Sequence, residues 1–172
     1  LVERSRWVGA AVGVDANPIA VRLARLKAGG MPAERRAALI DAAREAATFA
    51  DERRAARSGP THRYGHADMA MFQPHVLLEL DGLRAGIDRL PDRAPRAELE
   101  LALSAILTKL SRQASDTSEQ SVERRLAAGY PARLFVRKTE ELAQRLAAIE
   151  GPLAAAIPGR DAPLRVLEGD AR

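Results

Sequence analysis

Two aspartates stand where short apolar runs end, and they are the residues of this sequence best suited to hold a ligand. Asp15 ends the apolar run 8–14, and Asp170 follows the run 164–167 after a glycine. In open parallel sheets, ligands bind beyond the carboxyl ends of the strands. An aspartate at that edge can accept hydrogen bonds from both hydroxyls of a ribose, and a second acid can accept one from the exocyclic amine of adenine. The two aspartates are therefore candidate residues for binding an adenosine moiety.

The residues around Asp15 indicate a strand, a turn and a helix. The run 8–14 is rich in glycine, alanine and valine, which is typical of a strand buried on both faces. Asn17 is a favourable N-cap and Pro18 fits the first helical position, so a helix is predicted from Pro18 to the stop signal at Gly29. An aspartate before an Asn-Pro pair is also common in turns that bind nothing, and the residues alone leave both interpretations open.

Apolar residues in the middle of the chain recur at helical spacing. Aromatic residues make up only 3% of the sequence, while alanine and leucine dominate, so close packing of helices is expected. The predicted helices cover residues 31–57, 74–90, 99–110, 117–129 and 135–149, after a helical tail at 1–7. Loops are predicted at 58–69 and 91–95, a connector at 151–163 and a second buried strand at 164–167.

The positive charge of the chain is concentrated in residues 109–138. The whole sequence has a formal net charge of +4 and a pI near 10.1, which favours a polyanionic partner. Hydroxyl side chains are interspersed among these cations, and this mixture suits contacts with phosphates. The candidate nucleic-acid-binding residues are Lys109, Arg112, Ser115, Thr117, Arg133, Arg137 and Lys138. The alternative is that Arg124 and Arg125 pair with neighbouring glutamates and that residues 115–119 form a capped turn.

Other kinds of chemistry lack the residues that they need. The sequence has no cysteine, which excludes a disulfide, a thiolate nucleophile and a cysteine-ligated zinc, and fits a reducing cytoplasm. No run approaches the roughly 20 apolar residues of a membrane span. His62 and His66 stand four residues apart, but no glutamate follows His62 and no third ligand is evident, so no metal site is predicted. We therefore expect a cytoplasmic protein with no membrane contact.

The stretch VGVDANPIAVRLARLKA, which contains Asp15, resembles the second-strand segment of class I S-adenosylmethionine-dependent methyltransferases. It is most similar to the DNA amino-methyltransferases, which modify N4 of cytosine or N6 of adenine. LVE at the start of the sequence resembles the remnant of their GSGTTLVEA motif, and VLEGDAR resembles their third strand with its acid. The stretches MFQPHVLLELDGLRAGID, ALSAILTKLSRQASDTSE and RLFVRKTEELAQRL resemble the helical insertion of large bacterial and archaeal DNA methylases.

The resemblance implies an α/β fold, namely a fragment of a Rossmann-like methyltransferase sheet with a large, mostly helical insertion. The partial methyltransferase core would comprise residues 1–30, with the second strand and its helix, and residues 161–172, with the third strand. Residues 31–160 would form the helical insertion. The family's glycine loop and catalytic Pro-Pro-Tyr motif would lie outside these residues, so no catalytic residue is assigned.

Roles for single residues follow from the same resemblance. It implies that Asp15 holds the ribose of S-adenosylmethionine, that Asn17 and Pro18 shape the adjoining turn, and that Asp170 contacts the adenine. The implied activity is methylation of an exocyclic amine of a DNA base, with DNA as the partner. An RNA methyltransferase of the guanosine N2 type is an alternative, because such enzymes share the acid at the strand end. A non-catalytic helical module that binds nucleic acid is a third possibility.

Overall fold

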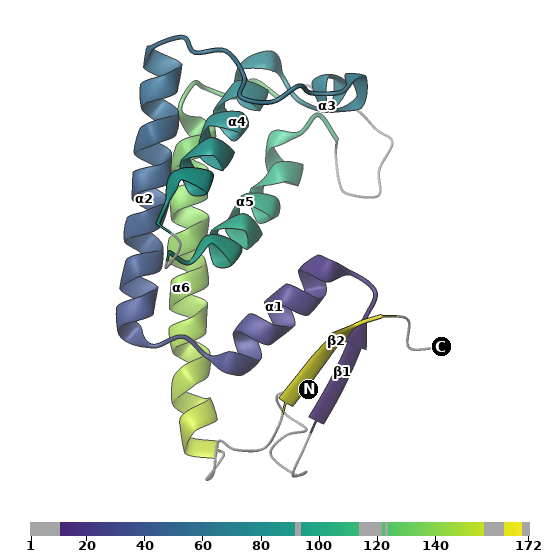
Figure 1. Cartoon of the computed structure of the whole chain (residues 1–172), viewed down its shortest axis with the longest axis vertical. Helices are drawn as coiled ribbons and strands as arrows, with labels where there is room; N and C mark the ends of the chain where they lie inside the picture. Colours follow the sequence, from purple (N-terminus) through teal and green to yellow (C-terminus); the bar gives the residue numbers. More distant parts are fainter. Residues whose placement is uncertain (1–10, 92–93, 114–121, 123, 157–163, 170–172) are drawn as a thin grey trace. The chain divides into compact units, whose positions relative to one another are not determined.

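The computed structural model describes residues 11–91, 94–113, 122, 124–156 and 164–169. These residues form helices and two short strands (Figure 1). In chain order the elements are β1 (Ala11–Asp15), α1 (Pro18–Gly29), α2 (Ala33–Ala55), α3 (His66–Met71), α4 (Pro74–Arg89), α5 (Arg96–Leu110), α6 (Tyr130–Ala156) and β2 (Leu164–Glu168).

The predicted fold class is wrong. Helices hold 70% of the described residues, and the sheet found there has two strands, so this is not a Rossmann-like α/β sheet. The physical reason is that the strand-forming runs are only five residues long, whereas the alanine- and leucine-rich segments between them have the period of helices.

The chain divides into two compact units. One comprises Leu1–Arg36 together with Ala143–Arg172, and the other comprises Ala37–Leu142. We call them the sheet unit and the helical unit, and each is described by itself.

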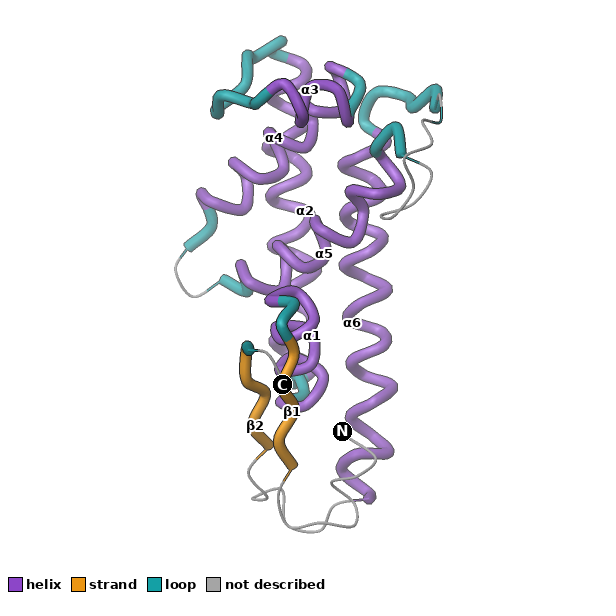
Figure 2. Tube along the Cα trace, turned by 90° about the vertical axis from the view of Figure 1, so that its right-hand side faces the viewer, coloured by secondary structure: helices purple, strands orange, loops and turns teal. Residues whose placement is uncertain are grey.

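β1 and β2 form a parallel pair in the sheet unit (Figure 2). The helix α1 packs against both strands. Val166 of β2 is buried, whereas Val12, Val14 and Leu167 are exposed. Since side chains alternate between the two faces of a strand, α1 covers one face and no described element covers the other. The prediction that these strands are buried on both faces is therefore wrong for the described residues.

The helix α1 also protects the outer edge of β2. Arg25 donates from Nε and Nη2 to the carbonyl oxygen of Val166, at 3.0 and 2.8 Å. A free backbone acceptor at a sheet edge invites pairing with another strand. The Arg25 guanidinium occupies this acceptor and so disfavours such pairing.

Small residues let α4 approach α2 closely in the helical unit. A Cβ atom at Gly86 would lie 2.7 Å from the carbonyl oxygen of Ala46, and one at Gly82 would lie 3.2 Å from the Cα of Ala50. Cβ atoms essentially never stand as close as 2.7 Å to another atom, so Gly86 is required for this contact. The buried face of α2 consists of alanines around Leu39, as its sequence pattern predicts.

Most predicted helices are present, with three differences. The helices predicted at 31–57, 74–90 and 99–110 are confirmed as α2, α4 and α5. A short helix, α3, occupies part of the predicted loop 58–69, and α6 continues to Ala156 through the first part of the predicted connector. Residues 124–127 are not helical, so the short helix predicted to end at Gly129 is wrong over that part. The helical tail at 1–7 and the cap at Thr117 lie outside the described residues.

Candidate functional site

Two carboxylates lie next to each other at the strand ends of the sheet unit. Asp15 is the last residue of β1, Glu168 is the last residue of β2, and their Cα atoms are register partners. Register partners in a parallel pair project to the same side of the sheet, so both side chains start from one edge and one face. The N–H of Gly169 donates to the carbonyl oxygen of Asp15 at 3.0 Å, which continues the pairing just beyond the strands.

The carboxylate of Asp15 is exposed and is oriented by its own turn. Its Oδ1 atom accepts a hydrogen bond from the backbone N–H of Asn17 at 2.8 Å. An ionised carboxylate offers about four lone-pair positions, so one such bond leaves room for two more donors. Asp15 can therefore accept both hydroxyls of a ribose while its turn holds it in place.

The N-terminus of α1, directly after Asp15, has few free donors. Asn17 Oδ1 accepts from the N–H groups of Ile19 and Ala20, at 2.9 and 3.4 Å, and Asn17 O accepts from the N–H of Val21 at 3.0 Å. Pro18, at the first helical position, has no N–H. The backbone N–H groups that usually bind a phosphate at a helix N-terminus are therefore already hydrogen-bonded to Asn17. The edge therefore suits a ligand that donates from hydroxyl groups better than one that presents phosphate.

Three of the four predicted cofactor-binding residues lie at this edge. Asp15, Asn17 and Pro18 form the strand end, the N-cap and the first helical position, as the sequence pattern predicts. Asp170 lies outside the described residues. The acid that the structure pairs with Asp15 is Glu168, which the sequence analysis did not select. The signal for Glu168 was its position directly after the predicted strand 164–167, two residues before Asp170.

The predicted nucleic-acid-binding residues are spread over two helices of the helical unit. Lys109 is exposed in the last turn of α5, and Arg112 is exposed just after it. Ser115 and Thr117 lie outside the described residues. The alternative of helical pairing for Arg124 is not supported, because Arg124 is not in a helix and its Nη2 donates to the carbonyl oxygen of Gln113 at 3.2 Å.

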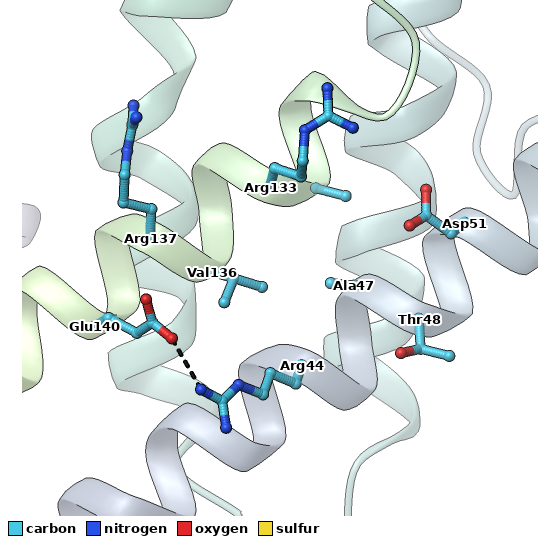
Figure 3. Close-up of a pocket in the computed structure, with 9 residues that line it drawn as sticks. Arg44, Ala47, Thr48, Asp51, Arg133, Val136, Arg137 and Glu140 are labelled. Carbon is cyan, nitrogen blue, oxygen red and sulfur yellow. Dashed lines mark hydrogen bonds and ion pairs between the residues drawn. The ribbon is translucent and has the colours of Figure 1, made fainter.

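Arg133 and Arg137 lie at a groove between α2 and α6, with a volume of about 340 Å³ (Figure 3). Ala47 and Val136 are among the apolar side chains that line it. Figure 3 shows Arg44 reaching from α2 to Glu140, at 3.0 Å, while Arg133 and Arg137 extend from successive turns of α6.

The two acids of this groove are already paired. Asp51 accepts from Nε and Nη2 of Arg54, at 3.2 and 3.0 Å, and Glu140 accepts from Arg44. Pairing neutralises these carboxylates, so Arg133 and Arg137 supply the positive charge that the groove presents to solvent.

Lys138 and Arg137 share one carboxylate on α6. Lys138 Nζ contacts Glu141 Oε2, and Arg137 Nε lies 4.0 Å from Glu141 Oε1. The Arg137–Glu141 pair is exposed, and such pairs on a helix are weak, typically about 0.3–0.5 kcal/mol. A phosphate can therefore compete with Glu141 for Arg137, while Lys138, which is less exposed, is the weaker candidate.

Two buried carboxylates of α4 were not predicted as functional residues from the sequence. Asp81 is 1% exposed and accepts hydrogen bonds from Thr61 N, Thr61 Oγ1 and Tyr64 Oη, at 2.7, 2.8 and 2.7 Å. Burial alone would raise the pKa of Asp81, but these bonds and Arg53, 3.8 Å away, lower it below its ordinary value. Burial, the bond to Asp81 and its negative charge raise the pKa of Tyr64 to about 12.

Glu79 is the second of these carboxylates. It is 3% exposed, and both of its oxygens accept from the N–H of Gly129, at 2.8 and 3.0 Å. Burial raises the pKa of Glu79, and the bonds from Gly129 offset only part of that effect. Gly129 has a φ of 74°, which a residue with a side chain adopts only at a cost. Glu79 thus fixes the turn that leads into α6, so this residue and Asp81 act as structural anchors.

The described residues include neither a metal-binding cluster nor a membrane-spanning helix. No group of three or more histidine, aspartate or glutamate side chains is placed there to hold a metal ion. His62 instead has Nδ1 3.0 Å from Nη2 of Arg84. No helix of that part of the chain has both the length and the apolar character needed to cross a bilayer.

Comparison with known proteins adds no assignment. No protein-family model matches the chain, and no curated protein or solved structure matches it significantly.

Proposed function

We propose that this chain forms part of an S-adenosylmethionine-dependent methyltransferase that modifies an exocyclic amine of a DNA base in the cytoplasm. The observation that carries the proposal is the parallel, in-register pairing of β1 with β2, with Asp15 opposite Glu168 at the carboxyl ends. Ligand sites of parallel strands lie at this edge, and two acids there suit the donors of an adenosine.

Different residues at this edge bind different parts of the cofactor. Asp15 accepts the ribose hydroxyls, held in position by the Asn17 N–H. Glu168, or Asp170 two residues later, accepts from the adenine amine. The first N–H groups of α1 already donate to Asn17, so they are not free to bind a phosphate. This supports S-adenosylmethionine as the ligand, because it has no phosphate. When bound, the cofactor supplies the methyl group from its sulfonium.

The helical unit contributes contacts with the DNA backbone. Arg133 and Arg137 at the α2–α6 groove, with Lys109 in the last turn of α5 and Arg112 just after it, are exposed cations that would position the duplex through its phosphates. Phosphate contacts carry no base specificity, so the target base is selected elsewhere.

Equilibrium binding of S-adenosylmethionine, measured by saturation-transfer NMR and calorimetry on the whole chain, tests the proposal. Asp15→Ala removes the acceptor of two charge-assisted hydrogen bonds, each worth about 1.5–3 kcal/mol, so we expect affinity to fall by at least tenfold. Asp41→Ala, at an exposed acid of α2, is the matched control and should leave affinity unchanged. Equal affinity of the Asp15→Ala variant and the wild type would exclude the ribose role.

A second candidate function is supported by the high helix content. A non-catalytic module that binds nucleic acid needs only the helical unit and its arginines. The charge reversals Arg133→Glu and Arg137→Glu should weaken DNA binding under either function and reduce its dependence on salt. Binding of S-adenosylmethionine distinguishes the two functions. A methyltransferase would bind it, whereas the non-catalytic module would bind DNA alone. Parallel titrations with an RNA duplex test the guanosine N2 alternative.

A further inference from the structure

Two adjoining cavities of the helical unit lie along one side of α4. The larger, about 450 Å³, lies between α4 and α5, and Leu107 of α5 is part of its lining. The smaller, about 360 Å³, is lined by residues of the segment before α3, by Met69 of α3 and by the first turn of α4. Tyr64 and Leu77 line both cavities, so the cavities adjoin, and we call the two together the α4 groove.

The α4 groove collects exposed apolar side chains. Met69, Leu78 and Leu107 are 51%, 42% and 37% exposed, and each lines one of the two cavities. Single exposed apolar residues are ordinary on a protein surface, but a contiguous patch marks an interaction site. Asp81 holds Tyr64 against this surface through a hydrogen bond of 2.7 Å, so the wall of the groove is already formed.

The length of the groove matches that of a helix. Residues of α4 from Pro74 to Asp88 line it, and at 1.5 Å per residue this stretch spans about 21 Å. A partner helix of about four turns has the same length. A small molecule would fill only one of the two cavities.

The charged residues that line the larger cavity indicate which charge a partner segment carries. The lining of the larger cavity includes the carboxylates of Asp68, Asp88 and Glu100, and its one described cation is Arg84. Nη2 of Arg84 lies 3.0 Å from Nδ1 of His62, which lines the smaller cavity. The smaller cavity is also lined by the cation Arg63, so the carboxylates of the groove belong to the larger cavity. The larger cavity therefore has a negative rim around an apolar floor, and this disfavours nucleic acid and favours a basic segment.

We infer that the α4 groove binds a basic amphipathic helix of a partner protein. Its apolar residues, at i, i+3 or i+4 and i+7, occupy the two cavities beside Leu78 and Leu107. Its lysines or arginines face Asp88 and Glu100. This surface is separate from the arginines of the α2–α6 groove, so it does not depend on the proposed methyltransferase function.

A fluorescence-anisotropy titration of the whole chain tests the inference with two labelled helical peptides. Both carry the same leucine stripe, one with flanking lysines and the other with flanking glutamates. The lysine peptide should bind and the glutamate peptide should not. Leu107→Ser removes an exposed anchor and should weaken binding by about tenfold. Asp88→Lys should weaken it several-fold, whereas Glu45→Lys, on the exposed face of α2, should not.

Circular dichroism will check that each variant is folded, and the three substituted residues, Leu107, Asp88 and Glu45, are all exposed. Equal binding of the two peptides, or of neither, would overturn the inference. So would sedimentation showing that the wild type dimerises and Leu107→Ser does not, because a second copy would then be the occupant. Loss of S-adenosylmethionine binding in Asp15→Ala leaves this test unaffected.

Discussion

Asp81 is the residue whose replacement should most disturb the helical unit. It is buried in α4, and it ties down the segment between α2 and α3 by accepting three hydrogen bonds from Thr61 and Tyr64. Hydrogen bonds to a charged acceptor are worth about 1.5–3 kcal/mol each. Thr61 is exposed, so its two donors bind water once Asp81 is removed, and the net loss is well below the sum of the three bonds. We expect Asp81→Ala to lower the free energy of unfolding by about 3 kcal/mol.

Urea denaturation followed by far-ultraviolet circular dichroism measures this loss. Asp81→Asn keeps one acceptor oxygen and should lose less, about 2 kcal/mol. Asp88→Ala, at an exposed aspartate of the same helix, is the control and should change stability by no more than about 0.5 kcal/mol. If Asp81→Ala costs no more than Asp88→Ala, the three bonds do not hold the segment and the argument is refuted.

Two further predictions concern the packing and the pH dependence of the helical unit. Gly86→Ala should destabilise the helical unit by about 1–3 kcal/mol, because the new Cβ would lie 2.7 Å from the α2 backbone. Gly82→Ala, whose new Cβ would have its nearest atoms at 3.2 Å, should be close to neutral. Thermal denaturation compares the two variants, and equal midpoints would contradict the close approach of α4 to α2. Burial raises the pKa of Glu79 above 4.5, so the folded state binds a proton more tightly than the unfolded state. The unfolding free energy should therefore fall as pH rises from about 4.5 through the folded pKa, and Glu79→Gln should abolish that slope in urea titrations at a series of pH values. An identical slope in both proteins would show that another group is responsible.

The helices were predictable where a cap and an apolar stripe agree. Asn17 and Pro18 mark the start of α1, and Pro74 marks the start of α4, because these residues favour those positions whatever the tertiary structure. The helix α3 was missed because six residues are too few to show a helical period. The fold class was misjudged because it rested on a resemblance centred on two short strands, whereas most of the described residues are helical. The burial of those strands was inferred from their composition, and the structure leaves Val12 and Val14 exposed.

The candidate site was predictable only in part. The position of Asp15 follows from its own neighbours, but its pairing with Glu168 depends on the register of strands far apart in the chain. The buried acids of α4 could not be found from the pattern, since a charged residue on a helix is normally exposed. Asp81 is buried because Thr61 and Tyr64 fold over it, and Glu79 because the turn at Gly129 closes on it.

The central claim is that the strand ends of β1 and β2 hold an adenosine. Backbone amide chemical shifts of the whole chain, recorded during titration with S-adenosylmethionine, test it most directly. The account predicts that the largest shift changes fall on Asp15, Asn17, Glu168 and Gly169. Changes confined to the helical unit, or no changes at saturating cofactor, would contradict it.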